Sequence, residues 1–132
     1  MEHLVSRKDF EQYVINAYER LPENIKNKVK NVALIVEDEP SVEVGRERNL
    51  GENDLLLGLY QGTPVTLRGA EYGIGGMTLP DKITIYQNSI EKIAGSEKEK
   101  IQELVFETMW HEIAHYFGMN EEEVHARELL NK

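Results

Sequence analysis

The stretch of sequence that decides the fold is HEIAHYFGMNE, residues 111–121. It contains the pattern H-E-x-x-H, formed by His111, Glu112 and His115. Residues four apart on a helix lie on the same face, so the two imidazole rings can turn toward one ion. Zinc favours such nitrogen ligands. Glu112 is rotated by about 100° around the helix from His111, and there it can accept a proton from a metal-bound water.

A third ligand has to come from beyond this helix. If the helix continued, residue 121 would lie about 15 Å along the axis from residue 111, too far to share a metal. Gly118 can adopt a positive φ, end the helix and turn the chain back. Glu121 then supplies the third ligand and water the fourth, as in catalytic zinc sites. His125, four residues further on a helix predicted over 120–130, is the alternative third ligand or supports Glu121 from behind.

Helical and strand patterns share the rest of the chain. The helix that carries the motif is predicted to begin at Ser96, which forms a capping-box pattern with Glu99, to run to Phe117 and to stop at Gly118. Upstream, the patterns predict a helix over 9–21, a buried strand over 32–36, a loop over 41–54, a strand over 55–60, a half-buried strand over 82–87 and a short helix over 88–94. This mixture indicates an α+β domain, and 132 residues suit a single domain over 1–132.

Composition narrows the classes of function. The net charge of −9 disfavours binding to nucleic acid or to anionic membranes. The chain has no cysteine, which excludes disulfides and thiol catalysis. The sequence has neither an apolar run long enough to cross a membrane nor a secretory signal at the N-terminus. We therefore expect a cytoplasmic protein that binds no nucleic acid and no membrane.

Five segments, in chain order, carry a resemblance to a known family. They are residues 10–22, 32–40 (VALIVEDEP), 57–62 (LGLYQG), 79–86 (LPDKITIY) and 111–118 (HEIAHYFG). Together they resemble the minimal zincin-like metallopeptidases, small bacterial H-E-x-x-H proteins also described as acidic zinc proteases. The resemblance implies a zincin fold, in which a small, mixed and twisted sheet packs on the motif helix between N-terminal and C-terminal helices.

The resemblance also implies roles for single residues. It implies that His111 and His115 bind Zn²⁺ and that Glu112 is the catalytic acid and base. The family usually has Asp where this chain has Glu121, so the choice of third ligand stays open. Only 14 residues follow Gly118, too few for the Met-turn and C-terminal subdomain of larger zincins. An oligomer or a partner protein is one way of completing the cleft.

The sequence thus predicts a zinc metallopeptidase that hydrolyses peptide bonds with an activated water and Glu112 as general acid and base. We expect a peptide substrate to pair with the strand over 82–87, with the glycine-rich stretch 68–79 as a lid. The alternative is a zinc-stabilised binding or adaptor module without turnover, and a metal-free structural domain is a weaker one. Two histidines and a carboxylate also suit cobalt, nickel or manganese.

Overall fold

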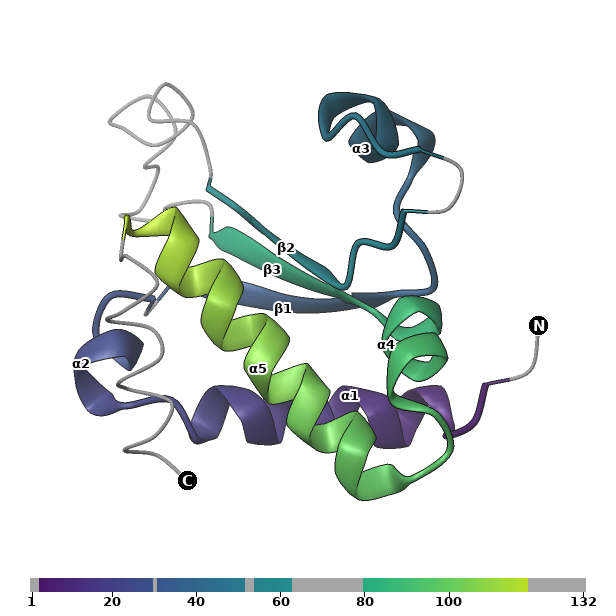
Figure 1. Cartoon of the computed structure of the whole chain (residues 1–132). Coiled ribbons are helices and arrows are strands. Elements are labelled where there is room, and N and C mark those ends of the chain that lie inside the picture. Colours follow the sequence, from purple (N-terminus) through teal and green to yellow (C-terminus); the bar gives the residue numbers. More distant parts are fainter. Residues whose placement is uncertain (1–2, 30, 52–53, 63–79, 119–132) are drawn as a thin grey trace.

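The structure is a computed structural model that describes residues 3–29, 31–51, 54–62 and 80–118 (Figure 1). Its elements in chain order are α1 (Arg7–Glu19), α2 (Glu23–Lys26), β1 (Val32–Glu37), α3 (Val42–Glu47), β2 (Gly58–Gln61), β3 (Asp81–Tyr86), α4 (Gln87–Ala94) and α5 (Lys98–Tyr116). The helix predicted over 120–130 and the stretch 68–79 lie outside the described residues. No helix in the described ranges is long and apolar enough to cross a membrane.

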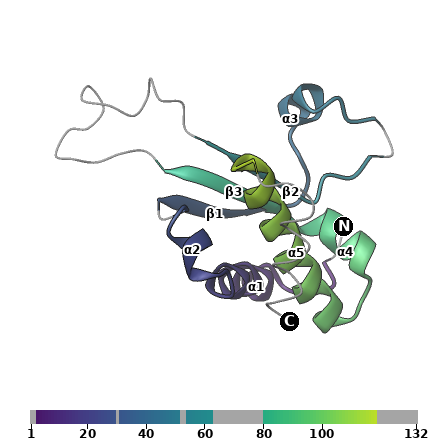
Figure 2. The same ribbon diagram turned by 60° about the vertical axis from the view of Figure 1, so that its left-hand side comes forward.

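The three strands form one mixed sheet in the order β1-β3-β2. β1 runs parallel to β3, with Leu34 opposite Ile83, whereas β2 runs antiparallel to β3, with Tyr60 opposite Ile83. α1 and α5 cover one face of the sheet, and α3 stands on the other side (Figures 1 and 2). This is the α+β arrangement with a small mixed sheet that the sequence predicts.

The core lies between the sheet and the two long helices. Ile83 and Ile85 point from β3 into it and are fully buried, as predicted. They meet apolar side chains of α1 and α5, among them Phe10, Val14, Ile101, Val105, Met109, Trp110 and Ile113. β3 is buried on both faces except at Lys82, so it is a central strand rather than the half-buried one expected. The central position removes both of its edges from solvent.

Two local predictions are corrected by capping chemistry. Residues 41–54 do not form a loop throughout, because α3 occupies Val42–Glu47. Ser41 nucleates this helix: its hydroxyl accepts a hydrogen bond from the Val44 N–H at 3.2 Å. At α5 the predicted capping box is wrong, since the N-cap is Glu97, not Ser96, and it makes no side-chain capping bond. Apart from these two helices, β2 begins at Gly58, three residues later than the strand expected.

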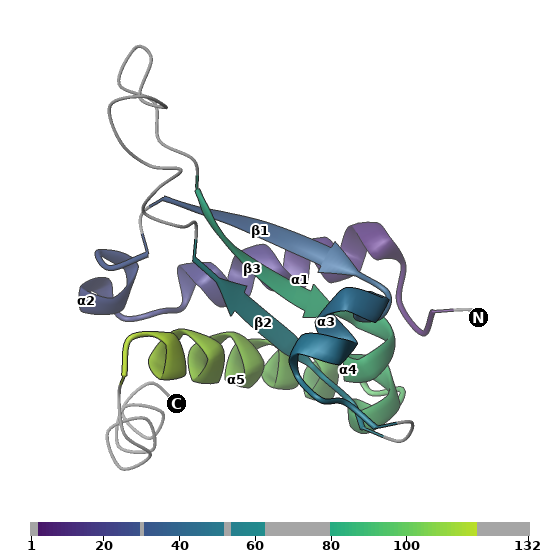
Figure 3. The ribbon, with the colours of Figure 1, turned by 90° about the horizontal axis from the view of Figure 1, so that it is seen from above.

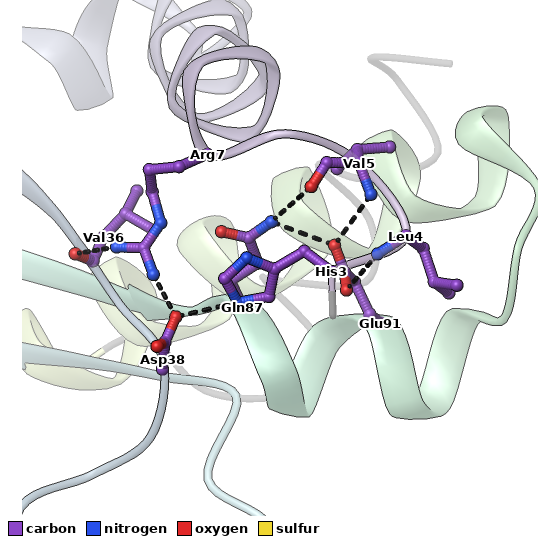
Figure 4. Close-up of polar contacts among 8 residues, drawn as sticks. All are labelled: His3, Leu4, Val5, Arg7, Val36, Asp38, Gln87 and Glu91. Carbon is purple, nitrogen blue, oxygen red and sulfur yellow. Dashed lines mark hydrogen bonds and ion pairs between the residues drawn. The ribbon is translucent and has the colours of Figure 1, made fainter. Parts of the chain in front are cut away.

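The N-terminal segment is held by the carboxylate of Glu91 in α4 (Figure 4). That carboxylate is buried and accepts hydrogen bonds from the Leu4 N–H at 2.9 Å and the Val5 N–H at 3.3 Å. Gln87 completes the arrangement by donating from its side-chain amide to both Val5 O and Glu91, each at 3.0 Å. The start of the chain is therefore fixed to the helix that follows β3.

A second set of contacts fixes the beginning of α1 to the end of β1. Arg7 donates to the Val36 carbonyl at 3.0 Å and pairs with Asp38, which His3 also meets at 2.9 Å (Figure 4). These contacts join the first residue of α1 to the end of a strand about thirty residues away in sequence. They therefore help to fix the position of α1 beneath the sheet.

Candidate metal centre

The two motif histidines lie one turn apart near the C-terminal end of α5. Ile113 and Ala114, between them in sequence, are fully buried against the core, so the turn is anchored on its inner side. His111 is half-buried and His115 is exposed. Their ring centroids are 6.2 Å apart with an interplanar angle of 68°. The helix thus presents two imidazoles to the same region, as the spacing predicts.

The orientation of His111 suits metal binding. Its Nδ1 lies 2.8 Å from the Glu107 carbonyl oxygen one turn earlier. A carbonyl oxygen only accepts, so Nδ1 carries the hydrogen and the lone pair is on Nε2. Metal-binding histidines commonly have one nitrogen fixed in this way, which sets the tautomer and the plane of the ring. The residue therefore fits the role of a nitrogen ligand to zinc.

Glu112 connects α5 to the sheet. Its Oε1 accepts a hydrogen bond from the Tyr60 N–H of β2 at 3.2 Å, although the two residues are 52 positions apart. Burial raises the pKa of Glu112 above that of an ordinary glutamate, and the Tyr60 N–H, Arg48 and the two histidines oppose the shift. A carboxyl with a raised pKa is better suited to exchanging protons near neutral pH.

The edge of the sheet beside Glu112 belongs to β2. The Leu57 carbonyl accepts a hydrogen bond from the Tyr86 N–H at 3.0 Å, so the backbone polar groups of Leu57 face β3. Because alternate residues of a strand direct these groups to opposite sides, the N–H and C=O groups of Gly58 and Tyr60 point away from β3. No described strand pairs with this outer edge. The expectation that a peptide pairs with residues 82–87 is therefore wrong, because β3 lies between β1 and β2 and has no open edge. Figure 3 shows α5 running alongside β2.

Tyr60 is fixed by contacts on both ends of its side chain. Its hydroxyl donates to Asp81 Oδ2 at 2.7 Å in a buried bond. The centroid of its ring lies 4.1 Å from that of Tyr116, which directly follows His115, and 5.9 Å from that of Phe117. These aromatic contacts hold the end of α5 against β2.

Gly118 ends the motif helix as predicted. Its φ is +73°, a conformation that favours glycine, and its N–H donates to the His115 carbonyl at 3.1 Å. The predicted third ligands, Glu121 and His125, lie outside the described residues. Among those described, no group of three or more histidine, cysteine or acidic side chains could hold a metal ion. The structure thus brings together two of the predicted ligands and the predicted catalytic acid and base.

A hollow of about 350 Å³ opens beside the motif. We call it the site hollow; it is lined by Leu56, Leu57, Gly58, Leu104, Glu107, Thr108, His111 and Glu112. Three leucines give the hollow an apolar wall, and the hollow reaches both His111 and the carboxylate that would exchange protons. Sequence reasoning missed Tyr60 and this lining, although the segment LGLYQG that contains Gly58 and Tyr60 was among those that carried the resemblance.

Together, the α+β fold and the H-E-x-x-H helix packed beside a strand edge define the class of zincin-like proteins. The chain belongs to the zincin-like metallopeptidase family, whose sequence model matches residues 29–130. Among solved structures, it is similar to a conserved hypothetical protein (TTHA0227) from Thermo thermophilus, with 25% identity and a TM-score of 0.53. That match covers 92% of this chain and 99% of the other. A search of curated proteins found no match.

Proposed function

We propose that this protein is a zinc-dependent metallopeptidase that hydrolyses a peptide bond with a water activated by Glu112. The observation that carries the proposal is the placement of Glu112. It lies between two histidines of one helical turn, accepts a hydrogen bond from an N–H on the outer edge of β2 and borders the site hollow. His111 and His115 would hold the metal, with Glu121 or His125 as the third ligand. When bound, zinc supplies a Lewis acid that polarises the peptide carbonyl and acidifies water.

Glu112 would move the protons of the reaction. In its ionised form it accepts a proton from the attacking water, and it then returns that proton to the amine that leaves. Burial raises the pKa of Glu112, and a raised pKa favours the return of the proton in the second step. The N–H of Tyr60 holds the carboxylate in place before substrate arrives.

An extended peptide would lie along the outer edge of β2. A strand edge holds a peptide through main-chain hydrogen bonds, which do not depend on the peptide's sequence. Pockets beside the edge then select its side chains. The site hollow begins at this edge, at Gly58, and would take the side chain next to the cleaved bond.

Metal content and turnover test the proposal together. Protein purified without chelator should contain about one zinc per chain, and His115→Ala should lose it. Glu112→Gln should keep the metal but lower kcat/KM on a cleaved library peptide by about 10²- to 10⁴-fold. Glu99→Gln, which makes the same charge change at an exposed position on the same helix, is the matched control. Equal turnover by Glu112→Gln and the parent protein would overturn the mechanism.

The bond between Glu112 and Tyr60 also supports a second candidate, a zinc-stabilised binding module. In that case Glu112 serves as a tie between α5 and β2 rather than as an acid and base. Metal removal would then lower the melting temperature, as in the peptidase, but no peptide in the library would be cleaved by the zinc-loaded protein. The turnover assay therefore separates the two.

A further inference from the structure

A second hollow of about 380 Å³ lies next to the site hollow. It is bordered by the start of α3, by α4 and by the segment around residues 50–56. Leu56 lines both hollows, so they are neighbours along the approach to β2. We call it the neighbouring hollow. None of the residues that line it has a part in the proposed proton transfer or metal binding.

Both hollows are bordered by two carboxylates, which in the site hollow are those of Glu107 and Glu112. The neighbouring hollow differs in that neither of its carboxylates takes part in the proposed proton transfer. Two carboxylates, Glu39 and Asp54, border it together with one ammonium group, Lys92. All three side chains are exposed, so they are accessible to a ligand. The side-chain oxygen of Asn88 is buried and has no hydrogen-bond partner among the described residues. A buried acceptor without a partner costs free energy unless a ligand or water satisfies it.

We propose that the neighbouring hollow binds a basic group of a peptide substrate, while the site hollow takes an apolar side chain beside the cleaved bond. This inference rests on the proposed function, because it places the two hollows along one peptide. It defines the substrate class as peptides that combine an apolar residue at the cleavage site with a lysine or arginine a short distance away on one side.

Charge favours a cationic occupant in the neighbouring hollow, whereas in the site hollow a bound zinc would offset the charge of the carboxylates. The charged groups of the lining sum to −1, from Glu39, Asp54 and Lys92. Asn88 also borders the hollow, and its buried side-chain oxygen lacks a donor among the described residues. The whole chain, at −9, attracts basic peptides and raises their rate of encounter. A volume of about 380 Å³ also falls within the range of sites for small ligands, about 300–1,000 Å³.

The segment between the two hollows limits the spacing of the two peptide groups. Leu57 lines the site hollow and Asp54 lines the neighbouring one, three residues earlier. Three residues of extended chain span at most about 10–11 Å. A peptide that follows this segment therefore carries its basic residue about two or three positions from the apolar one.

Binding to an inactive protein tests the inference without requiring turnover. The zinc-loaded Glu112→Gln protein is titrated with fluorescent peptides that have leucine at the centre and lysine, glutamate or alanine three positions away on either side. We expect lysine on one side to lower Kd at least about tenfold relative to glutamate, which is worth about 1.4 kcal/mol. Replacing the central leucine with aspartate should weaken binding by a similar factor.

Variants of the lining locate the effect. Glu39→Gln and Asp54→Asn, separately and together, should reduce the preference for lysine, and Lys92→Ala should preserve or increase it. Glu43→Gln, an exposed position on α3 outside the lining, is the matched control. Because Asp54 Oδ2 accepts from the Gly51 N–H at 2.7 Å, the melting temperature of Asp54→Asn is measured as well. Glu39→Gln makes no such change and keeps the test valid if Asp54→Asn unfolds.

The outcomes separate this inference from the proposed function. Equal Kd values for the lysine and glutamate peptides, a preference that survives both lining substitutions, or no binding would overturn the inference. Cleavage of these peptides by the parent protein without preference would overturn it too, while upholding the peptidase. A lysine preference in binding without any cleavage would support the subsite and count against the peptidase.

Discussion

At the scale of single residues, Gly58 determines how closely β2 approaches α5. A Cβ at this position would lie 2.7 Å from Thr108 Cγ2 and 3.1 Å from both Ile85 Cδ1 and the Thr84 carbonyl oxygen. The Thr84 oxygen belongs to the main chain of β3, so it cannot move away by a side-chain rotation. We expect Gly58→Ala to lower the free energy of unfolding by about 1–3 kcal/mol, measured by urea denaturation.

Two further variants test that explanation. Thr108→Ser removes the methyl group nearest to the added carbon, so the pair Gly58→Ala and Thr108→Ser should cost less than the sum of the single changes. Gly45→Ala on α3 meets no atom within 4 Å, and removing a helical glycine there should stabilise by about 0.5–1 kcal/mol. If Gly58→Ala and Gly45→Ala lowered the free energy of unfolding by similar amounts, the close contact at Gly58 would not be the cause.

Glu112 should cost stability in the metal-free protein. Burial raises its folded pKa above the ordinary value of 4.5, so the native state holds the proton more tightly than the unfolded state. Stability then falls as the pH rises from the ordinary value through the raised one, and the full cost is present above both. Glu112→Gln should therefore be more stable than the parent at pH 7 without metal, and the difference should close at pH 4. A less stable Gln variant at pH 7 would refute this.

At the scale of elements, the long helices were predictable because each carries its own periodic apolar face. α1 and α5 bury residues such as Phe10, Val14, Ile101 and Val105 at helical spacing. α3 was missed because it buries no residue fully and has no such face. It depends on the cap at Ser41, and one serine before a polar stretch is a weak signal beside the glycines around it.

The missed cap provides a matched comparison. Ser41→Ala removes the acceptor of the Val44 N–H and should lower the free energy of unfolding by about 1 kcal/mol. Ser96→Ala should change it little, because Ser96 is not the N-cap of α5. Thermal unfolding of the two variants checks this, and a larger loss at Ser96 would show that the cap of α5 is wrongly assigned.

The site was predictable where its residues are close in sequence and unpredictable where they are not. His111, Glu112 and His115 share one helical turn, so spacing alone placed them together. The contact of Glu112 with Tyr60 depends on the order of the strands, which local patterns do not determine. The alternating pattern of residues 82–87 fits an edge strand as well as a central one, and this is why the substrate edge was assigned to the wrong strand.

At the scale of the whole molecule, long-range contacts join the N-terminal segment and α1 to the elements around the motif helix. The N-terminal residues are held by Glu91 on α4, and Arg7 joins α1 to the end of β1 (Figure 4). α1 in turn packs along α5. The position of the motif helix beneath β2 is therefore set by long-range contacts, and binding of a metal to that helix should stabilise the folded chain as a unit.

Zinc should raise the melting temperature of the protein, because the unfolded chain lacks the paired geometry of His111 and His115. A ligand that binds only the folded state adds about 2.7 kcal/mol to stability at a concentration 100 times its Kd. His115→Ala should abolish the shift, whereas His3→Ala, the same change far from the motif, should retain it. Glu121→Ala should reduce it more than His125→Ala if Glu121 is the third ligand, and the reverse order would assign that role to His125. A zinc shift of equal size in His115→Ala would place the metal elsewhere and remove the basis for the proposed chemistry.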